Sequence, residues 1–144
     1  MAEKVIIRQK RNFETEIQAL DPQESEGKDF FYVEDARQLT PYGMLLTSLG
    51  ACTAIVVNTY AQNHGVDLQE VELHLTYSRD FNEDCENCTE IEKYEEHIDY
   101  VTFFRGDLSE ADVQRLFQVS RACSIHKMLE DGVQIDSRLG EREV

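Results

Sequence analysis

The most constraining feature of this sequence is an uncharged stretch from Thr40 to Gly65, more than twenty residues without Lys, Arg, Asp or Glu. It begins with a helix-capping threonine followed by Pro41, which suits the first position of a helix. It ends at Gly65, which suits a left-handed helix cap. A surface helix has one apolar stripe, whereas this stretch is apolar or small almost all round. We therefore predict one long central helix that is buried in the core.

The same stretch is long enough to raise the question of a membrane span. Polar side chains occur along it, among them Thr47, Asn58 and Gln62, and neither basic flanks nor a second span accompany it. These features favour the core helix of a soluble protein. We therefore expect no association with membranes.

The acidic composition excludes two further classes of partner. The formal net charge is −15, so nucleic acid and anionic membrane surfaces would both repel the chain. The first residues lack the apolar run of a secretory signal, which makes the cytoplasm the expected location.

The 144 residues are most simply one domain, 1–144. In a reducing compartment, four cysteines are better suited to catalysis, redox chemistry or metal binding than to a disulfide framework.

Around the central helix the sequence predicts an α+β protein with strands in two groups. Alternation of apolar and polar residues is clearest between Val71 and Tyr77. Ser109 and Asp112 have the spacing of a capping box and open an amphipathic helix, and a short helical piece ends at Gly132. Predicted strands lie at 5–7, 13–19, 30–33, 70–77, 97–106 and 133–136. The acidic residues 79–96 are predicted to form a solvated loop.

Cys52 and Cys123 are the first candidates for chemistry. A reactive cysteine must be a thiolate, which requires a positive or hydrogen-bonding neighbour. Cys52 lies about three turns into the central helix, where the helix dipole has faded. We therefore expect an arginine from another segment, Arg8, Arg11 or Arg37. Cys123 belongs to a different helix and could face Cys52 as a resolving thiol, although a buried cysteine can also be simply a small apolar residue.

The pair Cys85 and Cys88 is a weaker candidate, for zinc. A structural zinc site needs four ligands and this pair supplies two. His97, or the same pair from another subunit, could complete a site, but a plain acidic loop is the simpler interpretation. His126, three residues after Cys123, could contact a thiolate or could bond to the helix backbone. We predict no cofactor and no established metal site.

Two segments of the sequence resemble the signatures of a known family. The segments PYGMLLTSLGACTAIVVNTYAQNHG and SRACSIHKMLEDGVQID are similar to the central-helix and second-cysteine signatures of the OsmC/Ohr family. The DCENC loop and the segment IDYVTFFRGDLSEADVQRLF resemble one OsmC-like branch. Together these similarities cover roughly residues 33 to 136.

The resemblance implies an OsmC-like fold, in which antiparallel sheets wrap around a long buried helix in an intertwined homodimer. It also implies a thiol-dependent peroxidase that reduces organic hydroperoxides, with Cys52 as the peroxidatic thiolate and Cys123 as the resolving thiol. The resulting disulfide would be reduced by an external dithiol. The alternative is a non-catalytic OsmC-like protein that binds an apolar small molecule in the dimer cleft.

The sequence departs from the family pattern beside Pro41. In the Ohr branch a glutamate follows this proline and pairs with the arginine that activates the reactive cysteine, but here the residue is Tyr42. We predict that Arg37 takes the activating role, held by Glu34, Asp35 or backbone carbonyls.

Overall fold

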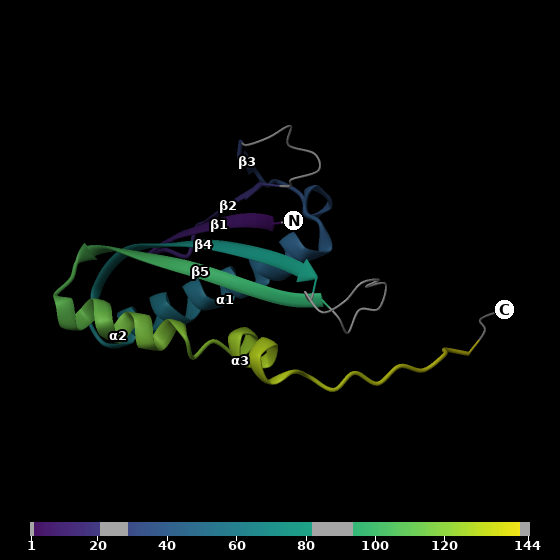
Figure 1. The fold of residues 1–144 in the computed structure, drawn as a ribbon. Helices are drawn as coiled ribbons and strands as arrows, with labels where there is room; N and C mark the ends of the chain where they lie inside the picture. Colours follow the sequence, from purple (N-terminus) through teal and green to yellow (C-terminus); the bar gives the residue numbers. More distant parts are fainter. Residues whose placement is uncertain (1, 21–28, 82–93, 142–144) are drawn as a thin grey trace.

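The computed structural model describes residues 2–20, 29–81 and 94–141. Figure 1 shows one sheet with the long helix α1 lying across it and two shorter helices beside α1. In chain order the elements are β1 (Ala2–Lys10), β2 (Thr15–Leu20), β3 (Phe31–Tyr32), the 3₁₀-helix η1 (Ala36–Gln38), α1 (Pro41–Asn63), β4 (Asp67–Phe81), β5 (Tyr94–Asp107), α2 (Glu110–Ser120) and α3 (Ser124–Asp131).

The strands form one sheet in the order β3-β2-β1-β4-β5, with every neighbouring pair antiparallel. This confirms the α+β class and the antiparallel pairing, although the described strands share one sheet where the sequence predicted two groups. Strands β4 and β5 are longer than predicted, and the register between them shifts between Leu68 and Glu70. Gly106 lies opposite this bulge with a φ of 153°, where a side chain would collide with the backbone of Asp67.

Helix α1 has the bounds that its sequence signals predict. The Thr40 hydroxyl accepts a hydrogen bond from the Gly43 amide at 3.0 Å, and Pro41 takes the first helical position. Gly65, just past the C-terminus, has a φ of 65°, the left-handed conformation expected there. At mid-helix Gly50 lets α1 approach the sheet closely, because a Cβ atom there would lie 2.6 Å from Cγ1 of Ile7.

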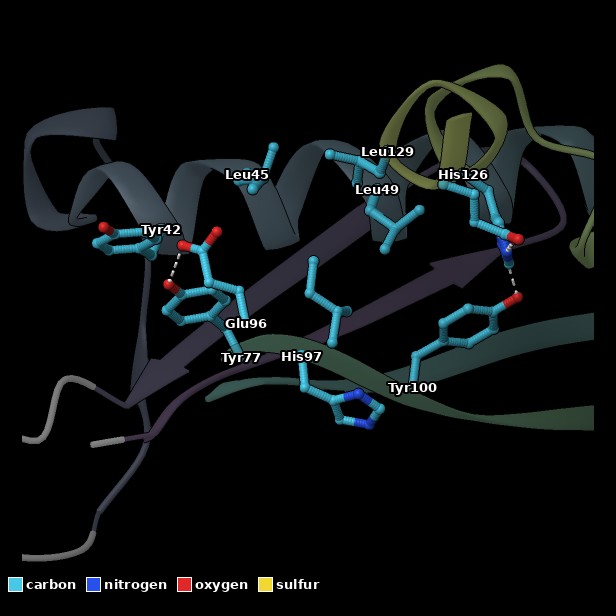
Figure 2. Close-up of a pocket in the computed structure, with 11 residues that line it drawn as sticks. Tyr42, Leu45, Leu49, Tyr77, Glu96, His97, Tyr100, His126 and Leu129 are labelled. Carbon is cyan, nitrogen blue, oxygen red and sulfur yellow. Dashed lines mark hydrogen bonds and ion pairs between the residues drawn. The ribbon is translucent and has the colours of Figure 1, made fainter. Parts of the chain in front are cut away.

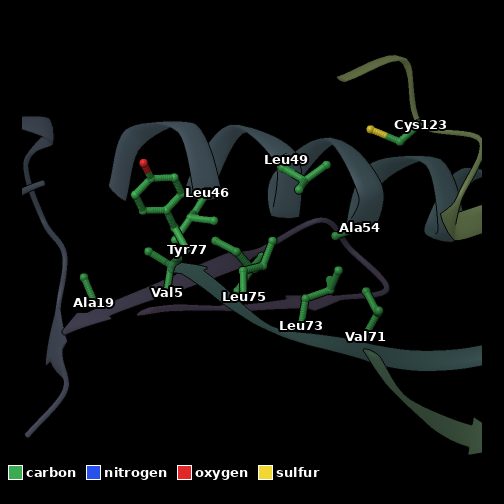
Figure 3. Close-up of a cluster of buried hydrophobic side chains, with 11 residues drawn as sticks. Val5, Ala19, Leu46, Leu49, Ala54, Val71, Leu73, Leu75, Tyr77 and Cys123 are labelled. Carbon is green, nitrogen blue, oxygen red and sulfur yellow. The ribbon is translucent and has the colours of Figure 1, made fainter. Parts of the chain in front are cut away.

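The hydrophobic core lies between α1 and the inner faces of β1 and β4 (Figure 3). Period-two alternation in β4 directs Val71, Leu73 and Leu75 to the same face, where all three are buried. Burying a side chain of this size stabilises the fold by roughly 2 kcal/mol. The sheet therefore gains most of its apolar contact from one face of α1.

The opposite face of α1 is exposed in the described chain, so the buried central helix that the sequence predicts needs a second surface to cover this face. Met44 and Ile55 are 44% and 48% exposed, and Ser48 and Thr59 lie on the same side. The physical reason is that a single sheet can cover only one face of a helix. The helix has the length and apolar composition needed to cross a membrane, yet in this structure it packs against β1 and β4.

Helix α2 begins with the predicted capping box, in which Ser109 and Asp112 bond to each other's backbone amides at 3.1 Å. Its predicted inner face is only partly buried. Leu116 and Ser120 are inaccessible to solvent, whereas Val113 and Phe117 are 36% and 44% exposed. The helix thus contributes less to the core of the chain than its periodicity indicates.

The predicted strand at 133–136 is wrong for the structure as described. Residues 132–141 form no helix or strand, and Val133 and Ile135 are exposed. Their alternation suits an extended backbone, but a strand also needs a hydrogen-bonding neighbour. No strand within the described ranges pairs with this segment.

Candidate functional site

Two free thiols meet where α3 begins against the middle of α1. Cys52 lies on α1 and is partly exposed, and Cys123 is buried as the residue that precedes the first turn of α3. The hydroxyl of Ser124 lies 3.9 Å from the sulfur of Cys52. The two thiols are close enough for each to shift the pKa of the other. The fold therefore joins two cysteines that lie far apart in sequence.

The surroundings of Cys52 favour its thiolate. Burial by itself raises the pKa of the thiol, because the charged form loses water. Hydrogen bonds from the Cys123 thiol, from the backbone amides of Ile125 and Ser124 and from the Ser124 hydroxyl outweigh that effect. The net result is a Cys52 pKa below its ordinary value, and hence a more abundant nucleophile at neutral pH.

The pKa of the Cys123 thiol is shifted in the opposite direction, above its ordinary value. Burial raises the pKa of its thiol and the neighbouring Cys52 raises it further, although the His126 amide and the Thr53 hydroxyl oppose the change. Cys123 therefore stays a protonated thiol that can donate to the Cys52 thiolate. Two identical side chains thus acquire different roles, one as nucleophile and one as neutral donor.

Sequence reasoning missed the amides that stabilise Cys52. It considered the dipole of the helix that carries Cys52 and arginines from other segments, whereas N–H groups in the first turn of α3 lower the pKa of Cys52. Helix N-termini leave such amides unpaired, and these favour a nearby negative charge. The signal was present, because Cys123 immediately precedes the helical segment SIHKMLED. What the sequence lacked was the position of that segment beside Cys52.

A proline at position 124 provides a test of this assignment. Ser124 is the first residue of α3, where proline is tolerated, and Cys123 before it has the extended backbone that proline requires, with φ −65° and ψ 137°. Ser124→Pro removes one amide and one hydroxyl from Cys52, so the pKa of Cys52 should rise. Iodoacetamide alkylation at pH 7 should slow by about threefold to tenfold, up to roughly one pKa unit.

Ser124→Ala is the matched control, because it removes the hydroxyl and keeps the amide. It should slow alkylation less than Ser124→Pro does, and the midpoint of the pH–rate profile should rank wild type, alanine and proline in ascending order. Equal midpoints in all three proteins would show that α3 does not tune Cys52.

Arg37 lies in η1, before α1 begins. Its guanidinium pairs with Asp35 at 2.8 Å, and its side chain is 90% exposed. Asp35 is one of the acceptors that the sequence predicted for it. No hydrogen bond or ion pair joins Arg37 to Cys52 within the described ranges, and the first turn of α1 is about 16 Å from Cys52 by helical rise. The catalytic role of Arg37 therefore stays a prediction.

The two other candidate arginines have acidic partners on the sheet. Arg8 pairs with Glu72 at 2.9 Å, and the Arg11 guanidinium pairs with Asp67. Burial raises the pKa of the Glu72 carboxyl, but hydrogen bonds with His74 and Arg8 and the charge of Arg105 outweigh it and lower this pKa to about 2. Arg8 therefore serves an ion-pair network on the sheet.

A cavity of about 500 Å³ lies between α1 and β5 (Figure 2), and Cys52 and Cys123 are not among its lining residues. Tyr42, Leu45 and Leu49 form its α1 wall. At the end near Cys123, the Tyr100 hydroxyl lies 3.1 Å from Nδ1 of His126. Further lining residues are Tyr77, Glu96, His97, Ile98, Leu129 and Glu130. The cavity can hold a mainly apolar small molecule.

His126 takes neither of the roles predicted for it. Its imidazole bonds to the Tyr100 hydroxyl and to the Glu130 carboxylate, so its partners are side chains. Its backbone amide, by contrast, acts on a cysteine, because it lowers the pKa of the Cys123 thiol. Sequence reasoning did not single out Tyr100, because its position on β5 opposite α3 is a tertiary contact.

The zinc candidates Cys85 and Cys88 lie outside the described residues. His97, their suggested partner, lies 3.2 Å from Asp99. Within the described ranges, no group of three or more His, Cys, Asp or Glu side chains could hold a metal ion. The weak zinc hypothesis therefore gains no support from the described part of the molecule.

Comparison with known proteins gives a family match that includes both cysteines. A family model described as OsmC-like protein matches residues 34–138, which include both signatures and both thiols of the site. No curated protein matches the sequence of this chain.

Solved structures with a similar fold include two OsmC-like proteins. One is an OsmC-like hydroperoxide resistance protein from Jannaschia sp. CCS1, with a TM-score of 0.63 and 14% identity, covering 99% of this chain and 96% of the other. The second is an OsmC-like protein from Mycoplasma pneumoniae, with a TM-score of 0.51 and 18% identity, covering 88% and 86%. At these identities the likeness establishes the fold.

Proposed function

The chain belongs to the OsmC-like protein family, and on this premise we propose that it is a cysteine peroxidase that reduces organic hydroperoxides. The observation that supports the proposal is the pair of adjacent free thiols with opposite pKa shifts. A peroxidatic cysteine must be a thiolate, and a resolving cysteine must lie within bonding distance of it. Cys52 fits the first role and Cys123 the second.

The reaction proceeds in two steps on this chain. The Cys52 thiolate attacks the distal oxygen of ROOH, the O–O bond breaks, and the alkoxide takes a proton and leaves as ROH. The Cys52 sulfenic acid then reacts with the Cys123 thiol, which forms the disulfide and releases water. An external dithiol reduces the disulfide and returns both thiols. No cofactor takes part in these steps.

Intact mass after one equivalent of cumene hydroperoxide tests the proposal. The expected result is the loss of two hydrogens, with a Cys52–Cys123 disulfide located by peptide mapping. An unchanged mass would reject the peroxidase proposal. It would favour instead a non-catalytic protein that binds an apolar molecule in the 500 Å³ cavity.

We also propose that the protein is a homodimer, because the described chain leaves apolar surface uncovered on two helices and on the segment after α3. These surfaces are Met44 and Ile55 on α1, Val113 and Phe117 on α2, and Val133, Ile135 and Leu139 after α3. Exposed apolar area of this extent is typical of a protein interface. Light scattering should give twice the chain mass of 16.7 kDa, and a well-folded monomer at micromolar concentration would contradict the proposal.

A further inference from the structure

The cavity follows one face of α1 toward the reactive thiol. Tyr42, Leu45 and Leu49 are spaced by three and four residues, so they form a single stripe on the helix. The next position in the same spacing is Cys52. A substrate whose peroxide group is at Cys52 therefore has its remaining atoms directed along this stripe. From Cys52 to Tyr42 the stripe extends about 15 Å by helical rise.

The middle of the cavity is apolar and its far end is not. Leu45 and Leu49 lie between the two ends in Figure 2, and Ile98 and Leu129 add further apolar lining. At the far end, Tyr42 and Tyr77 stack with ring centroids 4.4 Å apart, and the Tyr77 hydroxyl donates to the Glu96 carboxylate at 2.8 Å. Figure 2 shows this group at the opposite end of the cavity from Tyr100 and His126. The distal end of a long substrate thus reaches Glu96.

The charges that line the cavity are acidic. Among the described residues, the lining includes Glu96 and Glu130 and contains no lysine or arginine. Glu130 bonds to His126, and His97 lies beside Asp99. Arg79 donates to the Tyr42 hydroxyl at 3.3 Å but does not line the cavity. The protein as a whole carries a formal charge of −15, so the global field opposes an anion. At the distal end the Glu96 carboxylate acts beside Arg79, the residue opposite Glu96 in the register of β4 and β5.

We propose that this cavity selects uncharged organic hydroperoxides with an elongated apolar body and discriminates against those that end in a carboxylate. Glu96 is the residue that sets this preference, because a substrate carboxylate at the distal end would lie beside a like charge. Glu96 is exposed to solvent, so the repulsion is strongest at low ionic strength. The proposal rests on the proposed peroxidase function. It divides the organic hydroperoxides into free fatty-acid hydroperoxides, which bind poorly, and their esters, which bind well.

The test compares the hydroperoxide of linoleic acid with that of its methyl ester, which differ only in the terminal charge. Measured below micelle-forming concentrations at low ionic strength, kcat/KM should favour the ester by at least about tenfold. The preference should shrink at high salt, because screening weakens the repulsion. Equal values, or a faster acid, would overturn the proposal, and a faster acid would point to Arg79 as an anchor for the carboxylate.

Glu96→Gln tests the assigned residue. It should raise kcat/KM for the acid about fivefold, so that the ratio between the two compounds falls. Glu95→Gln is the matched control, because it removes the same charge from the neighbouring residue of β5, whose side chain lies on the other face of the sheet. The ratio should stay at the wild-type value in that variant. A ratio that falls equally in both variants would show that net charge, rather than Glu96, decides the preference.

Cumene hydroperoxide separates failure of this inference from failure of the proposed function. If cumene hydroperoxide oxidises Cys52 and neither long-chain compound does, the cavity does not accept elongated substrates and the inference is wrong. If none of the three compounds oxidises Cys52, the peroxidase function itself is rejected, together with the preference that rests on it.

Discussion

Replacing Cys52 with serine is expected to abolish hydroperoxide reduction. The Cys52 thiol has its pKa lowered by the Cys123 thiol and the α3 amides in spite of burial, whereas a serine hydroxyl stays protonated in the same place. Cys123 is not expected to take over, because its burial, which the substitution leaves in place, raises the pKa of its thiol. Cumene hydroperoxide consumption with dithiothreitol as reductant should fall by several orders of magnitude, to the uncatalysed background.

The double variant Cys85→Ser, Cys88→Ser is the control for this experiment. It removes two thiols and leaves both residues of the proposed site, so its activity should remain close to that of the wild type. Loss of activity in this variant, with activity retained by Cys52→Ser, would assign the nucleophile to Cys85 or Cys88. Circular dichroism of each variant shows whether the fold is kept.

Replacing Cys123 with serine should convert a catalyst into a reagent that acts once. Cys52 still attacks the first peroxide, since the serine hydroxyl can donate the hydrogen bond that the Cys123 thiol donated. The sulfenic acid then has no resolving thiol. We expect one equivalent of peroxide to be consumed per chain, a dimedone adduct on Cys52, and over-oxidation of Cys52 when peroxide is in excess. Turnover with dithiothreitol should fall at least about tenfold.

The opposite pattern would reverse the two roles. If Cys123→Ser lost the first turnover and Cys52→Ser kept it, Cys123 would be the peroxidatic residue. The raised pKa of Cys123 argues against that outcome, because a buried thiol that donates to a neighbouring thiolate is a poor nucleophile.

The sequence by itself determined the elements whose signals are local. The bounds of α1 follow from Thr40, Pro41 and Gly65, and the start of α2 follows from Ser109 and Asp112, because capping is an interaction between residues three or four positions apart. The wet and dry faces of β4 follow from its alternation. The two signature segments likewise identified the OsmC-like fold, which the family model and the structure confirm.

Only the tertiary structure decided which groups surround the two thiols. The lowered pKa of Cys52 depends on amides from residues 124 and 125, and the cavity depends on β5 lying opposite α1. Neither follows from spacing along the chain, because such contacts form only when distant segments pack. The same reason explains the wrong strand at 133–136 and the exposed face of α1. Apolar pattern shows which surfaces need covering, and only the arrangement of the folded elements shows which surfaces one chain covers for itself.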